Sequence, residues 1–329
     1  PRGLNQIVYG VRDGIVDWVD RRRAQDAEEP RPTYPATLRR APVDEPHPLE
    51  PALVVADLSV NFGGNLAVND AAVSVGHEEI VGLIGNNGAG KSTLMNAVGG
   101  FVPSRGSVRL LGEEVGSLGP ARRASLGLGR TFQSATLFPE LTVTETLLVP
   151  VEARRRTGSI GAALHLARAR TQSRDTASEV RDLIDFLGLG PYRDTYVSDL
   201  STGTRRVVEL AGLLALSAKV LCLDEPTAGL AQRETEAFGP LIVAVQRELS
   251  ASVLLIEHDM PLVMSISARV YCLETGAVIA HGLPQDIQHN PRVIASYLGT
   301  DERAIARSGR TDRPAAPVPD ATPVSPPVA

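Results

Sequence analysis

The fold is decided by Ile80-Val81-Gly82-Leu83-Ile84-Gly85-Asn86-Asn87-Gly88-Ala89-Gly90-Lys91-Ser92-Thr93. Its first five residues form an apolar run, as in a strand buried on both faces of a parallel sheet. The residues that follow fit the phosphate-loop pattern of glycine, four residues, glycine, lysine and serine. In that pattern backbone N–H groups and the positive end of the next helix surround a phosphate. A plain glycine-rich turn before a helix is the alternative. We expect the whole run from Gly85 to Thr93 to bind a nucleotide, with Lys91 on the β/γ-phosphates and Ser92 on Mg²⁺.

Two further apolar runs, Val220–Leu223 and Val253–Ile256, also predict buried strands, and polar residues follow each of them. Because the carboxyl ends of parallel strands meet at one edge of a sheet, these residues should converge on the phosphate loop. We expect Asp224 to hold Mg²⁺, Glu225 to act as the general base on water, and His258 to bond the γ-phosphate. The alternatives are a turn and helix start at Asp224-Glu225-Pro226 and an ordinary surface or core histidine at position 258.

Composition excludes several other classes of protein. The 329 residues carry a formal net charge of −5, so no general positive field is present to bind nucleic acid. Cys222 and Cys272 lie in apolar runs without the spacing of a metal or redox pair. The sequence holds no run of the ~20 apolar residues that a membrane span needs, so we expect membrane contact through a partner.

The pattern along the chain predicts a folded region between two extended ends. Residues 1–23 have the spacing of an amphipathic helix, residues 24–51 are a proline-rich linker, and residues 306–329 are a disordered tail rich in proline and alanine. Leu53–Phe62, Ala67–Val75 and Ser107–Leu111 alternate as half-exposed antiparallel strands do, which predicts a second sheet. Residues 135–200 show helical spacing and predict a helical subdomain.

The order of these motifs resembles the nucleotide-binding domain of ABC transporters. The likeness rests on Gly85–Ser92, Gln133, Leu200-Ser201-Thr202-Gly203-Thr204, Leu221–Glu225, Ala228-Gly229-Leu230-Ala231 and His258. It implies an α/β fold over residues 52–305, a P-loop NTPase (RecA-like) core with an antiparallel β subdomain and an inserted helical subdomain. It also implies that the domain hydrolyses ATP with Mg²⁺ as a dimer with a second ATPase subunit.

The resemblance assigns roles to four residues outside the phosphate loop. Phe62 matches the aromatic residue that stacks on adenine, with a core position on the sheet as its alternative. Gln133 matches the glutamine that touches Mg²⁺ and takes part in catalysis. Ser201 and Gly203 match the signature that closes over the partner subunit's γ-phosphate, although Ser201 could simply cap a helix. Thr202 and Thr204 depart from the glycine and glutamine of that signature.

A closer likeness is to the ATPases of branched-chain amino-acid importers. It rests on phrases such as Phe62-Gly63-Gly64, Arg130-Thr131-Phe132-Gln133 and residues 290–299. This implies permease partners and a place at the cytoplasmic face of the plasma membrane. Residues 1–23 resemble the cytoplasmic end of such a permease, so the chain could be part of a permease–ATPase fusion. The alternatives are an ATP-sensing regulatory subunit with weak turnover and a non-transport ABC protein.

Overall fold

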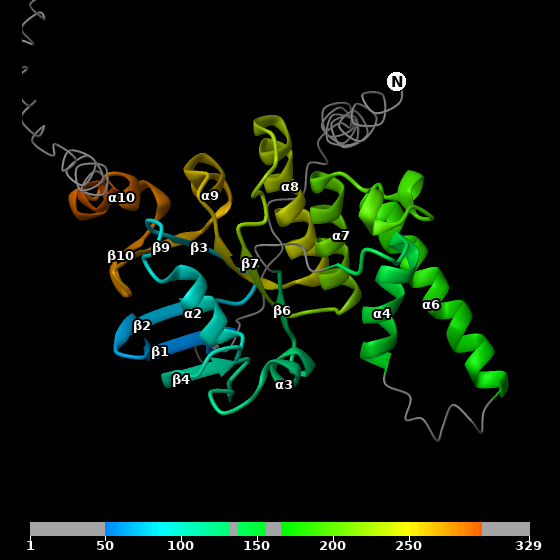
Figure 1. Cartoon of the computed structure of the whole chain (residues 1–329), viewed down its shortest axis with the longest axis horizontal. Helices are drawn as coiled ribbons and strands as arrows, with labels where there is room; N and C mark the ends of the chain where they lie inside the picture. The colour runs from blue at the N-terminus through cyan, green and yellow to red at the C-terminus, as the bar shows by residue number, and fades with distance from the viewer. Residues whose placement is uncertain (1–49, 132–136, 156–165, 298–329) are drawn as a thin grey trace, which may run out of the picture.

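The structure, a computed structural model, describes residues 50–131, 137–155 and 166–297. The predicted amino-terminal helix, the carboxyl-terminal tail and nearly all of the predicted linker lie outside these ranges. The described residues form two sheets with helices packed on them, so the α/β fold is confirmed (Figure 1). No helix within the described ranges has both the length and the apolar character needed to cross a bilayer.

The larger sheet has six strands and carries the predicted buried strands at its centre. Its order is β10 (Ala277–Gly282), β9 (Arg269–Glu274), β3 (Ile80–Ile84), β8 (Ser252–Ile256), β7 (Val220–Asp224) and β6 (Leu128–Arg130). All neighbours are parallel except β10 and β9, which form an antiparallel hairpin. The carboxyl ends of β3, β7 and β8 therefore open on the same edge.

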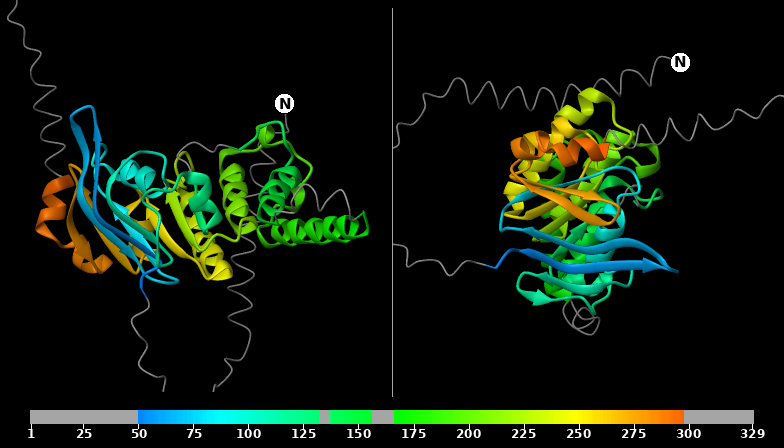
Figure 2. Two further views of the ribbon diagram at one scale, coloured as in Figure 1. Left: turned by 90° about the horizontal axis from the view of Figure 1, so that it is seen from below. Right: turned by 90° about the vertical axis from the view of Figure 1, so that its left-hand side faces the viewer.

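The smaller sheet is antiparallel, as the alternating sequence predicts. It has the order β2 (Asn65–Val75), β1 (Leu53–Phe62), β4 (Arg105–Leu110) and β5 (Glu113–Glu114). Helix α2 (Lys91–Val98) lies between the two sheets and contacts β1, β2 and β7. Figures 1 and 2 show the smaller sheet toward one end of the molecule and helices α4 (Val143–Arg155) and α6 (Leu166–Phe186) at the other.

The remaining helices surround the larger sheet and extend it on one side. They are α3 (Pro120–Ser125), α4 (Val143–Arg155), α6 (Leu166–Phe186), α7 (Thr202–Ala215), α8 (Gln232–Leu249), α9 (Met260–Ile266) and α10 (Pro284–Gln288), with 3₁₀ turns η1 (Gly190–Tyr192) and η2 (Val197–Asp199). Residues 291–297 form one more helical segment. Helices α4 and α6 lie in the region predicted to be helical.

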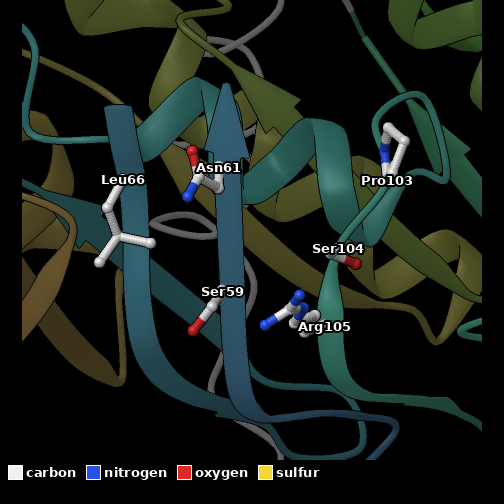
Figure 3. Close-up of a pocket in the computed structure, with 6 residues that line it drawn as sticks. All are labelled: Ser59, Asn61, Leu66, Pro103, Ser104 and Arg105. Atoms are coloured by element: carbon white, nitrogen blue, oxygen red, sulfur yellow. The ribbon is translucent and has the colours of Figure 1, made fainter. Parts of the chain in front are cut away.

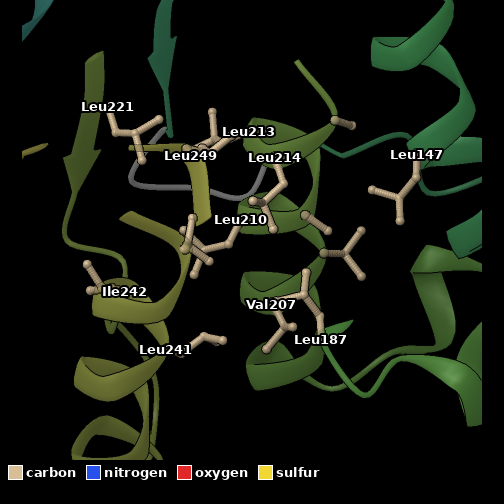
Figure 4. Close-up of a cluster of buried hydrophobic side chains, with 14 of the residues drawn as sticks. Leu147, Leu187, Val207, Leu210, Leu213, Leu214, Leu221, Leu241, Ile242 and Leu249 are labelled. Atoms are coloured by element: carbon tan, nitrogen blue, oxygen red, sulfur yellow. The ribbon is translucent and has the colours of Figure 1, made fainter. Parts of the chain in front are cut away.

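The central strands are buried on both faces, and successive side chains enter different cores. On β7, Leu221 and Leu223 pack with α7 and α8, whereas Val220 and Cys222 pack with α2 and the smaller sheet. This division follows the period of two in a strand. Figure 4 shows how leucines of α7 fill the space between β7, α8 and α4. The helical region is thereby tied to the sheet through α7.

Candidate functional site

The loop between β3 and α2 approaches neighbouring backbone so closely that it requires glycine. Gly85 has a φ of 147°, and a Cβ built there would lie 2.2 Å from the carbonyl oxygen of Leu273. Gly90 has a φ of 100°, and its Cβ would lie 2.4 Å from the carbonyl oxygen of Ala67. Both contacts are impossible for a residue with a side chain. The glycines of the phosphate-loop pattern are thus needed for the path of this loop.

Two carbonyl groups of the phosphate loop hold the Lys91 side chain in place. Its Nζ atom donates to the carbonyl oxygens of Gly85 at 2.6 Å and of Asn86 at 3.0 Å. Lys91 is only 5% exposed, and burial lowers the pKa of its ammonium group while the charges of Glu225 and Asp224 oppose that shift. A phosphate anion in the loop would supply the negative charge that this buried cation lacks.

Asp224 ends β7 and faces the start of α2. Its Oδ1 atom lies 3.4 Å from the Ser92 hydroxyl, and its Oδ2 atom lies 3.4 Å from the Arg130 guanidinium. Burial raises the pKa of the Asp224 carboxyl, and the charge of Arg130 partly counters this effect. The hydroxyl of Ser92 and the carboxylate of Asp224 are hard oxygen donors of the kind that Mg²⁺ prefers.

The oxygen pair at Ser92 and Asp224 fits a magnesium ion that is held jointly with a nucleotide. Within the described ranges, no cluster of three or more acidic, histidine or cysteine residues could hold a metal by itself. Mg²⁺ ordinarily binds through one or two protein oxygens together with substrate phosphates and water. The residues present therefore suit that mode and do not form a closed protein cage.

Glu225 and His258 meet at the same edge, as predicted. Nε2 of His258 lies 2.8 Å from Oε1 of Glu225, and the Glu225 side chain is 13% exposed. Glu225 has a φ of 48°, a left-handed conformation that is uncommon for residues with a side chain. Its N–H donates to the carbonyl oxygen of Ile256 and holds the turn against β8. Strained backbone of this kind is frequent where a side chain must be directed at a site.

A cleft of about 370 Å³ lies at this edge and is lined in part by Lys91, Ser92 and Glu225. Asp224 and His258 do not line it, but they contact Ser92 and Glu225. The volume of the cleft lies within the range of small-molecule sites. The cleft is lined by residues of β2, the phosphate loop, the end of β7 and the β9–β10 turn, namely Asn65, Leu66, Ala67, Asn87, Gly88, Ala89, Gly90, Lys91, Ser92, Thr93, Glu225 and Thr275. Most of the predicted phosphate-binding residues therefore face one cavity.

Three predicted site residues outside the phosphate loop, Phe62, Ser201 and Gly203, do not line the cleft either. Phe62 ends β1 and is 49% exposed, so it is no core residue of the sheet. Ser201 and Gly203 lie at the start of α7. The Ser201 hydroxyl accepts a hydrogen bond from the N–H of Thr204 and caps the helix. Gln133 lies outside the described residues.

The structure adds residues that the motif analysis missed. Thr275 enters the cleft from the turn between β9 and β10, and the next residue, Gly276, donates its N–H to the carbonyl oxygen of Ala89. A Thr-Gly pair between two apolar runs is a turn signal, but it does not reveal that the turn supports a loop almost 190 positions earlier. Nothing in the local sequence indicates this contact.

A second hollow, of about 310 Å³, lies on the smaller sheet between β1 and β4 (Figure 3). Figure 3 shows Ser59 and Asn61 on β1, Leu66 on β2 and Arg105 on β4 around it. Asn61, Leu66 and Arg105 are exposed, and the Ser59 hydroxyl donates to Asp70 on the same sheet. The residues that line this hollow include two serines, an asparagine and an arginine but no carboxylate, so it lacks the combination of a buried cation and acidic groups found around Lys91.

The family of the chain follows from comparison with known proteins. Residues 68–228 match the family model described as ABC transporter, and residues 277–303 match the model described as branched-chain amino acid ATP-binding cassette transporter. The high-affinity branched-chain amino acid transport ATP-binding protein LivG of Salmonella typhimurium is 38% identical over 251 residues, which is 76% of this chain and 98% of that protein. The corresponding BraF protein of Pseudomonas aeruginosa is 38% identical over 250 residues, 76% of this chain and 98% of that protein.

Solved structures share the fold. A nucleotide-free ATP-binding cassette from an ABC transporter superposes with a TM-score of 0.64 at 23% identity, covering 75% of this chain and 98% of the other. The ADP conformation of such a cassette gives a TM-score of 0.63 at 23% identity, covering 76% and 99%. The chain belongs to the ATP-binding proteins of ABC transporters, in the group of branched-chain amino acid cassettes, and is an ATPase.

Proposed function

We propose that this chain binds Mg²⁺-ATP in the cleft beside the phosphate loop and couples its hydrolysis to the import of branched-chain or related amino acids. The observation that carries the proposal is the convergence of Lys91, Ser92, Asp224, Glu225 and His258 at the carboxyl edge of β3, β7 and β8. The amino-acid substrate is taken from the names of the LivG and BraF relatives.

The side chains divide the chemistry of phosphoryl transfer to water. Lys91 exchanges its two loop carbonyls for phosphate oxygens, and the N–H groups of residues 85–93 surround the same phosphates. Ser92 and Asp224 would hold Mg²⁺, which neutralises developing charge on the phosphates when bound. We assign a further contact with that ion to Gln133.

Glu225 takes the proton of the attacking water, because its carboxylate lines the cleft together with Lys91 and Ser92, where the phosphates and the water would lie. His258, bonded to Glu225, orients that carboxylate and donates toward the γ-phosphate. Phe62 stacks on the adenine at the exposed rim of the smaller sheet. General-base catalysis of this kind is worth ~10²–10⁴-fold in rate.

Ser201 and Gly203 are proposed to act on the nucleotide of a second ATPase subunit. Both lie at the exposed start of α7 rather than in the cleft of their own chain. The positive end of this 14-residue helix and the Ser201 hydroxyl are suited to a phosphate. The permease is expected to contact the helical region around Gln133, α4 and α6, at the cytoplasmic face of the membrane.

Two variants test the enzymatic part of this proposal. Lys91→Ala should abolish tight ATP binding and turnover, because it removes the charge for the phosphates and leaves the loop glycines in place. Glu225→Gln should keep ATP binding, lose hydrolysis and accumulate a dimer with trapped ATP. Normal hydrolysis by Glu225→Gln would show that another group is the base.

The transport part needs a cellular measurement. Deleting the gene in the source organism should reduce uptake of radiolabelled leucine but not of sulfate, and the wild-type gene should restore uptake. Glu225→Gln should fail to restore it although the protein is present. Unchanged leucine uptake in the deletion strain would refute the substrate class and leave the ATPase assignment standing.

A further inference from the structure

The last described helical segment, residues 291–297, reaches back to the start of the phosphate loop. It lies within the region matched by the branched-chain family model, 277–303. Its contacts join parts of the chain that are 210 positions apart. None of the roles proposed above uses this segment.

The first contact is made by Asn86, the second residue of the loop. Its side-chain Nδ2 donates to the carbonyl oxygen of Ser296 at 2.6 Å. Ser296 is 8% exposed, and its hydroxyl donates to the carbonyl oxygen of Val293 at 2.7 Å. Its side chain also hydrogen-bonds Cys272 on β9. The acceptor of Asn86 is therefore itself fixed, within its helix and to the larger sheet.

The second contact is made by Tyr297. Its hydroxyl is hydrogen-bonded by the backbone of Gly85, the first residue of the loop. The ring belongs to the edge of an apolar cluster that includes Ile84, Cys272 and Val293. Burial raises the pKa of the Tyr297 hydroxyl to about 12, and the hydrogen bond with the Gly85 backbone opposes that shift.

These two contacts act on the residues that hold Lys91. The Lys91 ammonium donates to the carbonyls of Gly85 and Asn86, and the segment that ends at Tyr297 binds the same two residues. Gly85 and Asn86 therefore connect Lys91, the lysine that would bind phosphate, to the segment of residues 291–297.

Apolar packing keeps the segment against the sheet. Ile84, Val270 and Cys272 of the larger sheet, Val263 of α9, Ile287 of α10 and Val293 form one buried cluster. Ile84 directly precedes Gly85, so the cluster lies immediately beneath the loop. Burial of these apolar side chains stabilises the segment, since a helix of this length would be marginal alone.

We propose that residues 291–297 position the phosphate loop, with Tyr297 and Asn86 as the positioning pair, and that this contact sets the affinity for Mg²⁺-ATP. The proposal rests on the proposed function of residues 85–93 as the phosphate site. A loop held in one conformation before binding loses less conformational entropy when it closes around phosphate. The segment acts on binding rather than on the hydrolytic step, since its contacts are with Gly85 and Asn86, the two residues whose carbonyls hold Lys91.

The decisive variants remove one hydrogen bond each. Tyr297→Phe deletes the hydroxyl and keeps the ring in its apolar cluster, and Asn86→Ala deletes the donor to Ser296. Each should weaken Mg²⁺-ATP binding by roughly two- to tenfold, the range expected for one net hydrogen bond. In Tyr297→Phe, which leaves every residue of the loop in place, kcat at saturating ATP should stay within about twofold. Affinity is measured by equilibrium titration of the purified full chain, and kcat by phosphate release.

Tyr271→Phe is the matched control. Tyr271 is also a buried tyrosine on the larger sheet, but its hydroxyl contacts Ser74 on β2 and not the loop. It should leave ATP affinity at the wild-type value. Wild-type affinity in Tyr297→Phe, or an equal loss in Tyr271→Phe, would overturn the proposal. So would an effect confined to kcat.

Hydrogen exchange separates this inference from the proposed function. In the nucleotide-free protein, amides of residues 85–92 should exchange faster in Tyr297→Phe than in the wild type or Tyr271→Phe. If the wild type binds no ATP, the phosphate-site assignment fails, and faster exchange still supports the link between segment and loop. If exchange in residues 85–92 is unchanged, the link itself is wrong.

Discussion

Thr227 donates two hydrogen bonds to a single carboxylate oxygen of Glu257. Its backbone N and Oγ1 atoms lie 2.8 Å and 2.6 Å from Oε1 of Glu257, and both side chains are buried. The other oxygen of Glu257 accepts the backbone N–H of His258 at 3.1 Å. One buried carboxylate therefore joins the segment after Glu225 to the backbone of His258.

We predict that the Glu257 carboxylate fixes the positions of Glu225 and His258 relative to each other. Thr227→Val removes the hydroxyl without changing the shape of the side chain, and Glu257→Gln removes the charge. Each should lower kcat by about ten- to hundredfold with a smaller change in KM, because misplaced catalytic groups cost rate rather than binding. Steady-state ATPase kinetics and thermal unfolding of each variant provide the measurement.

The double variant decides whether the pair acts as a unit. Its loss of kcat should be close to that of the worse single variant, because contacting residues are non-additive. Thr146→Val is the control, since the buried Thr146 hydroxyl on α4 has no hydrogen-bond partner. Multiplicative losses in the double variant, or an equal loss in the control, would contradict a specific role for the pair.

Arg123 is predicted to be a main determinant of stability at the carboxyl end of α2. It is 2% exposed and donates to four carbonyl oxygens, those of Ala97 (2.8 Å), Val98 (2.6 Å), Leu118 (2.8 Å) and Gly116 (3.0 Å). Two of these acceptors end α2, where a cation also complements the helix dipole. Arg123→Met should reduce the free energy of unfolding by about 3 kcal/mol or more, as carbonyls lose a charged donor.

Urea unfolding measures this loss, and the neighbouring arginine provides the comparison. Arg122 is exposed on the same helix, so Arg122→Met should change stability by less than about 0.5 kcal/mol. Arg123→Lys should recover only part of the loss, because an ammonium group cannot reproduce the planar fork of donors. Equal stability of the Arg122 and Arg123 variants would show that the four hydrogen bonds contribute little.

Asp224 leads to a prediction about pH. Its pKa is raised, chiefly by burial, so the folded protein binds this proton more tightly than the unfolded chain does. The ionised carboxylate consequently costs stability, and nucleotide-free stability should fall as the pH rises from the ordinary value near 4 through the raised pKa. Above that window Asp224→Asn should be at least as stable as the wild type.

The same group should be needed for magnesium. Wild-type affinity for Mg²⁺-ATP should decline as the pH falls through the raised pKa of Asp224, because a protonated carboxyl is a poor ligand. Asp224→Asn should bind Mg²⁺-ATP more weakly than the wild type at neutral pH, and its affinity should not follow the titration of Asp224. ATP itself also titrates, but this contribution is the same for both proteins and cancels when their affinities are compared at each pH. Wild-type affinity of the Asn variant at neutral pH, or the same decline at low pH in both proteins, would exclude Asp224 as a ligand.

Local patterns were sufficient to predict most of the fold. Leu53–Phe62 and Ile80–Ile84 are strands with the predicted bounds, and the two kinds of hydrophobic pattern correspond to two sheets. The reason is physical, because burial on one or both faces of a sheet imposes a period on the sequence itself. The predicted meeting of Glu225 with His258 follows from the same parallel topology.

Contacts between distant segments were not predictable in this way. Neither Tyr297 nor Thr275 belongs to a phosphate motif, and each reaches the loop only because β9 and the segments after it lie beside β3. Helix α7, by contrast, has the cap that the sequence itself indicated at Ser201. It begins at Thr202, because the Ser201 hydroxyl accepts from the N–H of Thr204 and makes Ser201 the cap.

The position of Thr202 leads to the last prediction. Thr202 is the first residue of α7 and is exposed. It is not one of the described residues that have a positive φ, so its backbone is not left-handed. Its methyl group would lie 3.6 Å from a Cβ built at Gly229. A threonine here is therefore free of backbone strain, and its cost to the signature comes from the bulk of its side chain near an approaching phosphate.

We accordingly expect a working but weakened signature. ATPase activity should rise cooperatively with protein concentration, Thr202→Gly should hold or raise it, and Ser201→Ala should lower it. Because alanine also removes a cap worth about 1 kcal/mol, Ser201→Asn is the sharper variant, since asparagine caps as well as serine but lacks the hydroxyl. If Ser201→Asn stays folded and loses cooperative activity, the hydroxyl acts on the nucleotide of the second subunit. If Ser201→Asn behaves as wild type and only Ser201→Ala is impaired, Ser201 is a helix cap, and the departures at Thr202 and Thr204 mark a signature that no longer contributes to hydrolysis.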